Sequence, residues 1–320
     1  MSEQDRLPLP PGGQAPDEVW WVLPEDGIRV RAACWRAPDP VGHVLFLTGR
    51  TEYIEKAALP AADFVRRGYS VVSLDWRGQG LSSRQAEAGL KGHVGDFQEY
   101  QRDLDAVLAS EHVAALTGPC ILVAHSMGGC IAAQAMARPE ILDRLSAVIL
   151  SAPMFGIALN PAMRAAGWLT AKIGMALGMG TRWPPFGDVS TPYALSEPED
   201  NVLTTDPEVM AWMTRVAQEH PESSIAMPTL GWFNSATAAM KAVARLPEPD
   251  VPILCLLGSD ERVVDKAAVE SAAERMHVRL VRIGGAQHEV LIEAAPLRAI
   301  AWRAIDDFIE ANRLPMRTTA

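Results

Sequence analysis

One short segment near the middle of the chain limits its possible folds more than any other. Residues 121–124 are apolar and of strand length, Ser126 follows, and Gly128 and Gly129 lead into a helical pattern. A strand that turns this sharply into a helix strains the backbone of the residue at the turn, so the residues two before and two after must be small. Ala124 and Gly128 meet this requirement. Because the helix N-terminus directs its N–H groups toward the turn, the pattern favours a nucleophilic serine.

Two later strand ends carry the partners that such a serine needs. A buried-strand pattern at 251–257 is followed by Asp260 and Glu261, and a second strand at 277–283 is followed by His288. Serine, acid and histidine thus occur in the chain order of a nucleophile, an orienting acid and a general base, each after a strand. We therefore expect His288 to accept the serine proton, with one of the two acids holding its imidazole ring.

An early strand, residues 43–47, supplies the remaining part of such a site. It is followed by a loop that begins Thr48-Gly49-Arg50. In this arrangement one oxyanion donor is the backbone N–H of the residue after the nucleophile, and the other comes from the loop after the early strand. We therefore predict an oxyanion hole formed by the N–H groups of Met127 and Arg50. The alternative for the loop is an ordinary polar surface turn.

Several segments follow one another in a characteristic order over most of the chain. They are residues 49–52, 75–82 and 92–94, the turn around Ser126, Gly258-Ser259 with the acids after it, and residues 285–289. In these segments the chain resembles the monoacylglycerol lipase and bacterial lysophospholipase branch of the α/β-hydrolases. The resemblance implies a serine hydrolase that needs no cofactor and no metal. The segment 75–82 is expected to be structural, with its glycines in tight backbone and Arg77 bonded to loop carbonyls.

The chain departs from this family's pattern in two places. Thr48 stands where the family commonly has histidine, which should keep the backbone donor but lose a side-chain hydrogen bond. The family's acid is usually the aspartate in Gly-Ser-x-Asp-Arg, whereas this chain has Glu261 at that place and Asp260 one residue earlier. A glutamate can orient an imidazole if the loop accommodates one more methylene. We favour Glu261 and keep Asp260 as the alternative, while Asp265 is expected to cap the next helix.

Strand and helix patterns alternate along the first half of the chain, which indicates a parallel sheet with helices on both faces. The strands at 19–23 and 28–35 are joined by a hairpin-type turn and should form an antiparallel edge. The predicted fold class is α/β: an α/β-hydrolase fold with a mostly parallel eight-stranded sheet, flanking helices and an inserted helical cap.

The alternation stops in the middle of the chain, and this interruption sets the expected domain organisation. We predict a disordered or frayed tail at 1–16, a hydrolase core at 17–151 and 249–320, and a helical cap at 152–248. The first cap helix, 161–177, is apolar almost all round, so it either packs in a core or lines an acyl pocket. The residues proposed to bind substrate are Met154, Met163, Trp168, Met175 and Trp232.

Composition excludes several other kinds of protein. The formal net charge of -10 disfavours binding to nucleic acid and to anionic membrane surfaces. The cap helix is too short and too charged to span a membrane. The four cysteines have no CxxC spacing, so neither a disulfide nor zinc is expected. With no signal-like segment at the start, a cytoplasmic location is expected. The oligomeric state stays open.

The sequence leads to one main functional expectation and two alternatives. The main expectation is a carboxylic-ester hydrolase that cleaves a lipid-like monoester, a monoacylglycerol or a lysophospholipid, through an acyl-enzyme on Ser126. A shallow cap pocket would instead give an esterase for short-chain or aryl esters. A protein of another class, which kept the fold for binding and lost turnover, is the third possibility.

Overall fold

The computed structural model describes residues 6–84, 90–185, 192–195 and 201–317. Its centre is an eight-stranded sheet with the strand order β1-β2-β4-β3-β5-β6-β7-β8. The strands are β1 Glu18–Val22, β2 Val30–Trp35, β3 Gly42–Leu47, β4 Tyr69–Leu74, β5 Cys120–His125, β6 Leu145–Ser151, β7 Ile253–Gly258 and β8 Arg279–Ile283. β2 is antiparallel to β1 and β4, and every later pair is parallel. The predicted fold class is confirmed.

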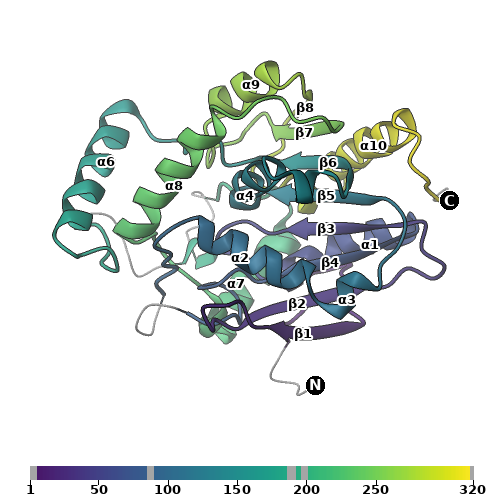
Figure 1. Cartoon of the computed structure of the whole chain (residues 1–320), viewed down its shortest axis with the longest axis horizontal. Helices are drawn as coiled ribbons and strands as arrows, with labels where there is room; N and C mark the ends of the chain where they lie inside the picture. Colours follow the sequence, from purple (N-terminus) through teal and green to yellow (C-terminus); the bar gives the residue numbers. More distant parts are fainter. Residues whose placement is uncertain (1–5, 85–89, 186–191, 196–200, 318–320) are drawn as a thin grey trace.

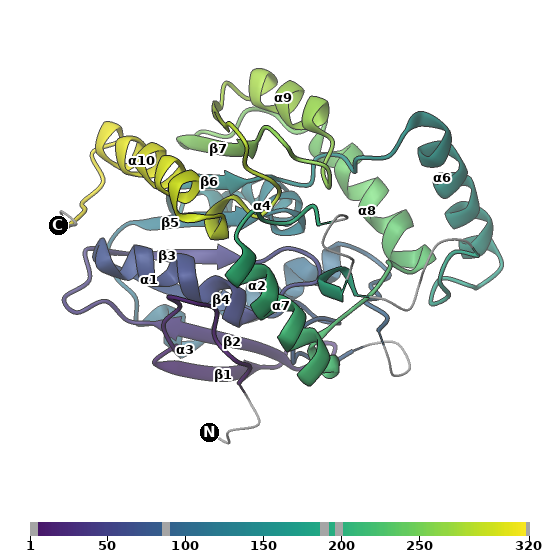
Figure 2. The same ribbon diagram turned by 180° about the vertical axis from the view of Figure 1, so that it is seen from behind.

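Helices cover both faces of this sheet (Figure 1). They are α1 Ala58–Arg66, α2 Gln98–Leu108, α3 Glu111–Ala114, α4 Met127–Met136, α5 Pro139–Leu142, α6 Pro161–Ala176, α7 Pro207–Glu219, α8 Leu230–Val243, α9 Lys266–Arg275 and α10 Ala295–Ala311, with short 3₁₀ helices η2 Ile54–Ala57, η3 Tyr193–Leu195, η5 Pro221–Ser223 and η6 Val290–Ile292. α1 and α10 lie on one face, and α2 and α4 lie on the other (Figures 1 and 2).

Apolar side chains on both faces of the central strands form the core. In β3, Val44 and Phe46 pack toward α1 and α10, whereas Leu45 and Leu47 pack toward α2 and α4. Successive side chains of a strand point to opposite faces, and here helices cover both. This explains why the strand patterns in the sequence are continuous apolar runs rather than alternating ones.

The start of the described chain packs against the domain, so the expected frayed tail is wrong for residues 6–16. Leu7 is buried, and its N–H donates to the Glu55 carboxylate. The indole of Trp212 donates to the carbonyl of Pro8, and that of Trp35 donates to the carbonyl of Gln14. Each buried indole N–H needs an acceptor, and the extended segment provides it. Residues 1–5 lie outside the described residues.

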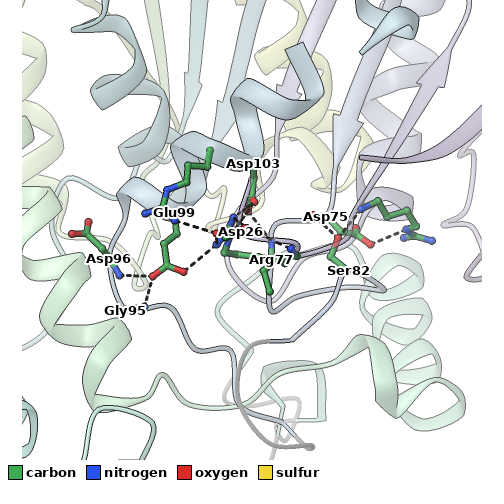
Figure 3. A network of polar contacts seen from close by, with 11 residues as sticks. Asp26, Asp75, Arg77, Ser82, Gly95, Asp96, Glu99 and Asp103 are labelled. Carbon is green, nitrogen blue, oxygen red and sulfur yellow. Dashed lines mark hydrogen bonds and ion pairs between the residues drawn. The ribbon is translucent and has the colours of Figure 1, made fainter. Parts of the chain in front are cut away.

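Arg77 has a structural role, as expected, but the prediction that it bonds loop carbonyls is wrong. Its guanidinium is fully buried and pairs with the carboxylates of Asp103, Asp26 and Glu99 (Figure 3). A buried cation needs opposite charge close by, which carbonyl oxygens do not supply. Burial raises the pKa of Asp103 to about 6, although its bonds to Arg77 act in the opposite direction.

Helices replace strands between β6 and β7, where the cap is expected. α8 packs on α4 of the core, and α6 packs on α8 from the outside (Figures 1 and 2). Only Ala171 and Gly174 of α6 are buried, so most of this helix faces solvent. The extent of the cap, 152–248, stays a prediction. Within the described residues, no helix combines the length and apolar character needed to cross a membrane.

Candidate active site

Ser126 lies at a strained turn between β5 and α4. Its backbone has φ 50° and ψ −118°, a conformation that residues with side chains rarely adopt. A side chain on Gly128 would collide with the carbonyl oxygens of Leu47 and Thr48, so only glycine fits there. The turn is fixed further because the Ser126 carbonyl accepts a hydrogen bond from Met154 N–H at 2.8 Å. The predicted strand-turn-helix geometry is thus present.

The structure brings together the three side chains that the sequence places after separate strands. Nε2 of His288 lies 3.0 Å from Oγ of Ser126, and Nδ1 of His288 lies 2.7 Å from Oε2 of Glu261. All three residues are buried. Both distances are within the reach required for proton transfer and for orientation of the imidazole.

Glu261, not Asp260, is the acid that reaches His288. The Asp260 carboxylate accepts a hydrogen bond from the Ser259 hydroxyl and is exposed. The second oxygen of Glu261 accepts the N–H groups of Val263 and Val264, at 2.5 and 3.0 Å. The turn after β7 thus accommodates the longer side chain and leaves one carboxylate oxygen for the histidine.

The surroundings of Glu261 favour its charged form. Burial alone would raise its pKa, but the hydrogen bond and charge of His288, together with the two backbone N–H donors, outweigh burial and lower the pKa below its usual value. Glu261 therefore carries the negative charge that an orienting acid in a triad needs. A few residues further along, Asp265 caps α9 through the N–H groups of Ala267 and Ala268, as predicted.

The loop after β3 passes directly beside the serine. A side chain on Gly49 would lie 3.0 Å from Cβ of Ser126, so this close approach needs glycine. Thr48 is buried, and its hydroxyl donates to the carbonyl of Leu74 at 3.1 Å. The Thr48 side chain thus has a hydrogen bond of its own to the neighbouring strand, and the loss of the bond expected from the family's histidine stays a prediction. The loop thus places the backbone of Gly49, the residue before Arg50, against Ser126.

Sequence reasoning missed a buried charge cluster behind the serine and the histidine. The ammonium group of Lys56 lies 2.8 Å from Glu52 and 2.5 Å from Glu289. Nε2 of His125 lies 3.3 Å from Glu289, and the rings of His125 and His288 are 4.7 Å apart. The only local signal was the spacing of four between Glu52 and Lys56, which brings side chains together on one side of a helical turn.

This cluster joins the two loops that border Ser126. Glu52 accepts the N–H of Gly49 in the loop after β3, whereas Glu289 directly follows His288 in the loop after β8. Lys56 bonds both carboxylates and so connects the loops. In a buried site such a cation replaces the water that would otherwise solvate the carboxylates.

Burial and Lys56 shift the pKa values of Glu52 and Glu289 in opposite directions: burial raises them and Lys56 lowers them. Burial would raise the pKa of Glu52, but Lys56, His125 and the Gly49 N–H lower it to about 2. Burial raises the pKa of Glu289 to about 7, with Lys56 acting against this and the charge of Glu52 adding to it. The oxygen and nitrogen atoms of Glu52, His125 and Glu289 are close enough to hold a metal ion. The ammonium of Lys56 already supplies positive charge there, so this cluster does not fit a cation site.

The five residues proposed to bind substrate fall into two groups. Met154 follows β6, bonds the Ser126 carbonyl through its N–H and is 5% exposed, and Trp232 is 3% exposed beneath the guanidinium of Arg50. On α6, by contrast, Met163 is 56% exposed, Trp168 41% and Met175 38%. Among the described contacts, none joins these α6 side chains to Ser126. The structure thus places Met154 beside the Ser126 turn and Trp232 beneath the Arg50 side chain, and leaves the other three residues on the outer helix.

The sheet order, the strained serine and its histidine partner together place this protein among the α/β-hydrolases. Solved structures of this class share its fold: a soluble variant of monoglyceride lipase from Saccharomyces cerevisiae aligns with a TM-score of 0.70, covering 93% of this chain and 97% of its own, at 17% identity. Residues 38–295 match the family described as serine aminopeptidase, S33, and the chain belongs to that family.

Relatives with closer sequences are bacterial. Lysophospholipase L2 of Escherichia coli strain K12 is 32% identical over 308 residues, which cover 91% of this chain and 86% of the relative. A probable lysophospholipase L2 of Haemophilus influenzae is 31% identical over 273 residues, with 84% of each chain covered. The sequence resemblance to the lysophospholipase branch is therefore confirmed.

Proposed function

We propose that the protein is a serine carboxylic-ester hydrolase that cleaves a lipid-like monoester through an acyl-enzyme on Ser126. The observation that carries this proposal is the buried chain of hydrogen-bonding groups from Ser126 through His288 to Glu261, with distances of 3.0 and 2.7 Å. A serine activated by a base, with the base oriented by a third group, is the arrangement that nucleophilic acyl transfer requires.

Each group in this arrangement has a defined part in the reaction. Nε2 of His288 accepts the hydroxyl proton while Oγ of Ser126 attacks the ester carbonyl, and Glu261 stabilises the imidazolium that forms. The backbone N–H groups of Met127 and Arg50 are proposed to bind the oxyanion, and each such donor contributes about 3 kcal/mol. The imidazolium then protonates the departing alcohol. Water, activated by the same histidine, hydrolyses the acyl-enzyme and restores the serine.

The substrate class rests on the relatives and on the apolar side chains near the serine. Lysophospholipase L2 proteins and a monoglyceride lipase are among the similar proteins, so we propose a lysophospholipid or a monoacylglycerol as substrate. Met154 and Trp232 are proposed to contact the acyl group, because they are buried and apolar beside the Ser126 turn and the Arg50 loop. Met163, Trp168 and Met175 stay proposed contacts for longer chains.

Hydrolysis rates over a series of esters test this proposal. The series contains p-nitrophenyl esters from acetate to dodecanoate, a monoacylglycerol and a lysophospholipid. We expect wild-type rates to rise with chain length, and Ser126→Ala to lower kcat at least about 10⁴-fold. Ser146→Ala, at a partly exposed position in β6, is the matched control and should keep full activity. Activity limited to acetate would favour the short-chain esterase, and no hydrolysis of any ester would favour the binding protein.

A cytoplasmic location is also proposed rather than established. The four cysteines are all buried and unpaired in the described structure. Free thiols are typical of a reducing compartment. Thiol titration of protein isolated without reductant tests this, because four free thiols are expected and intermolecular or newly formed disulfides would contradict the proposal.

A further inference from the structure

A cavity lies at the amino ends of the central strands, opposite the end of the sheet where Ser126 lies. It is a cleft of about 500 Å³ at the amino ends of β3 and β5, between α2, α3 and α5. His43 and Cys120, which lie at the beginnings of these two strands, line it. Since Ser126 follows the other end of β5, a strand rise of about 3.3 Å per residue separates the two sites by about 20 Å. The cleft is therefore distinct from the proposed active site.

Most of the side chains that line the cleft are apolar. Apart from His43 and Arg144, every lining side chain is aliphatic or a cysteine. Four of the apolar side chains are only partly buried although they border the core: Leu108, Val113, Leu116 and Leu145. The fold thus leaves accessible apolar surface inside a concavity, which is the usual character of a site for an apolar ligand.

Arg144 provides a cationic group at this cleft. Its side chain is exposed and, among the described residues, makes no hydrogen bond or ion pair. Arg138, a few residues earlier, instead bonds the carboxylates of Asp105 and Glu140. The chain has a net charge of -10, yet no protein carboxylate pairs with Arg144 among the described residues. This arginine, beside an apolar cleft, is therefore available for an anionic ligand.

We propose that this cleft binds a fatty acid, with its acyl chain along the apolar walls and its carboxylate on the guanidinium of Arg144. An acyl chain has no hydrogen-bonding groups, so the aliphatic side chains of the lining suit it. A guanidinium binds a carboxylate through two parallel hydrogen bonds. The volume also lies within the range of about 300–1,000 Å³ that is common for ligand pockets.

This inference goes beyond the proposed function and does not require turnover. A fatty acid would be the acid product of the proposed reaction, and the cleft can hold it while the serine site, at the other end of β5, stays open. Binding at the cleft is therefore measured separately from hydrolysis. If the protein hydrolyses no ester, the binding experiment still decides whether the cleft takes a fatty acid.

Photo-crosslinking locates the bound fatty acid on the full-length protein. The probe is a tetradecanoic acid that carries a diazirine on its chain, and the crosslinked peptides are identified by mass spectrometry. We expect crosslinks in residues 104–122 and 135–145, which contain most of the cleft lining. Crosslinks confined to the surroundings of Ser126 and Met154 would overturn the proposal, because they would indicate product binding at the serine site only.

Matched variants test the role of the carboxylate and of the cleft volume. Arg144→Gln should weaken crosslinking by tetradecanoic acid about tenfold, with part of the affinity kept in Arg144→Lys. Ala114→Trp, which adds bulk to the lining, should abolish crosslinking in these peptides. The controls are Asp143→Asn and Ala115→Trp, at exposed neighbouring positions outside the lining. Equal crosslinking in the Arg144 and Ala114 variants and in their controls would contradict the proposal.

A probe with the same chain and an alcohol head group separates binding of the acyl chain by the apolar walls from binding of the carboxylate by Arg144. Its crosslinking should be weaker than that of the acid in wild-type protein and should not change in Arg144→Gln. Hydrolysis of p-nitrophenyl acetate should stay unchanged in all of these variants, because none of them lies near the serine. Loss of acid and alcohol crosslinking to the same degree in Arg144→Gln would contradict a carboxylate contact.

Discussion

The loops at the carboxyl ends of the strands, here called the carboxyl edge of the sheet, differ from the outer cap helix α6 in the kind of side chain that they bury. At the edge, charged and polar side chains are enclosed: Lys56, Glu52, Glu289, His288 and Glu261 are all buried. On α6 the large apolar side chains are the exposed ones. Enclosed charges must be paired at fixed positions, whereas exposed apolar groups need no particular partner. The side chains at the carboxyl edge are thus held in fixed positions before substrate binds, whereas the exposed side chains of α6 are not.

The two regions also differ in how they are attached to the rest of the molecule. The edge is crosslinked by side chains distant in sequence, such as Lys56 with Glu289, which are 233 residues apart. α6 is attached mainly through its packing on α8. We therefore expect substitutions at the edge to have large effects on activity and stability, and substitutions on α6 to have small effects. The four predictions below test this difference, beginning with the largest effect.

The acid at the edge should have the largest effect. Glu261→Gln removes the negative charge that stabilises the imidazolium of His288, so kcat should fall about 10³-fold to 10⁴-fold. Asp260→Asn, one residue earlier, should change kcat less than about twofold, because its side chain bonds Ser259 instead. Initial rates with a saturating p-nitrophenyl ester measure both. The reverse order of the two effects would assign the acid to Asp260.

The buried lysine should have the next largest effect. Lys56→Met leaves Glu52 and Glu289 buried without their cation, so the free energy of unfolding should fall by about 3–5 kcal/mol. Lys241→Met on α8 is the matched control. Lys241 is exposed, and its ammonium lies 5.5 Å from the ring of Trp168, so its loss should cost about 0.5 kcal/mol. Urea unfolding measures both values.

A triple variant separates loss of the cation from loss of packing. When Glu52→Gln and Glu289→Gln are added to Lys56→Met, no unpaired charge remains in the cluster, and much of the lost stability should return. If the triple variant is no more stable than Lys56→Met alone, the lysine acts through the packing of its aliphatic chain and the electrostatic explanation is wrong.

The pH dependence of stability should show a smaller effect that originates at the same edge. Burial raises the pKa of Glu289 from 4.5 to about 7, so folding favours its protonated form. The stability that this group contributes is complete below pH 4.5 and is lost as the pH rises through about 7, about 3 kcal/mol in all. Glu289→Gln cannot titrate and resembles the protonated glutamate, so the Tm of wild type should fall relative to that of this variant between about pH 5 and pH 7.

The exposed Glu208 of α7 provides the comparison for this measurement. Glu208→Gln should keep the wild-type pH dependence, since its side chain is exposed at the surface of the helix. A constant difference in Tm between wild type and Glu289→Gln over the same pH range would show that Glu289 is charged throughout, held so by Lys56. That result would contradict the expected titration of Glu289 and would support an ion pair between Glu289 and Lys56 over the whole pH range.

Sequence patterns predicted the parts of the site that depend on local chain geometry. The serine turn, the histidine loop and the capping role of Asp265 each follow from residue order within a few positions. The charge cluster was missed because Lys56 and Glu289 come together only through the sheet. Arg77 was given the wrong partners for the same reason: Asp103 belongs to α2 and Asp26 to the turn after β1. Local pattern shows that a buried cation needs partners, but not which acids supply them.

The helix α6 shows a second limit of sequence patterns. Its apolar residues favoured a buried helix or a pocket lining, and its bounds were predicted almost correctly. Hydrophobic periodicity shows which side chains are apolar but not what covers them. In the structure α8 covers one side of α6, and the remaining apolar side chains are exposed. The role of these side chains therefore needs a measurement with substrate.

The smallest expected effect concerns this exposed helix. If a long acyl chain extends from the serine to α6, contact with Trp168 buries part of an indole that is now 41% exposed and contributes about 0.5–1 kcal/mol. Trp168→Ala should then raise KM for p-nitrophenyl dodecanoate about threefold, leave acetate hydrolysis unchanged and lower Tm by about 1 °C, through loss of the contact with Lys241. Leu23→Ala, at an exposed apolar position after β1, is the matched control and should leave both esters unchanged. An unchanged KM for dodecanoate in Trp168→Ala would remove Trp168 from the substrate site and confine acyl binding to residues such as Met154 and Trp232.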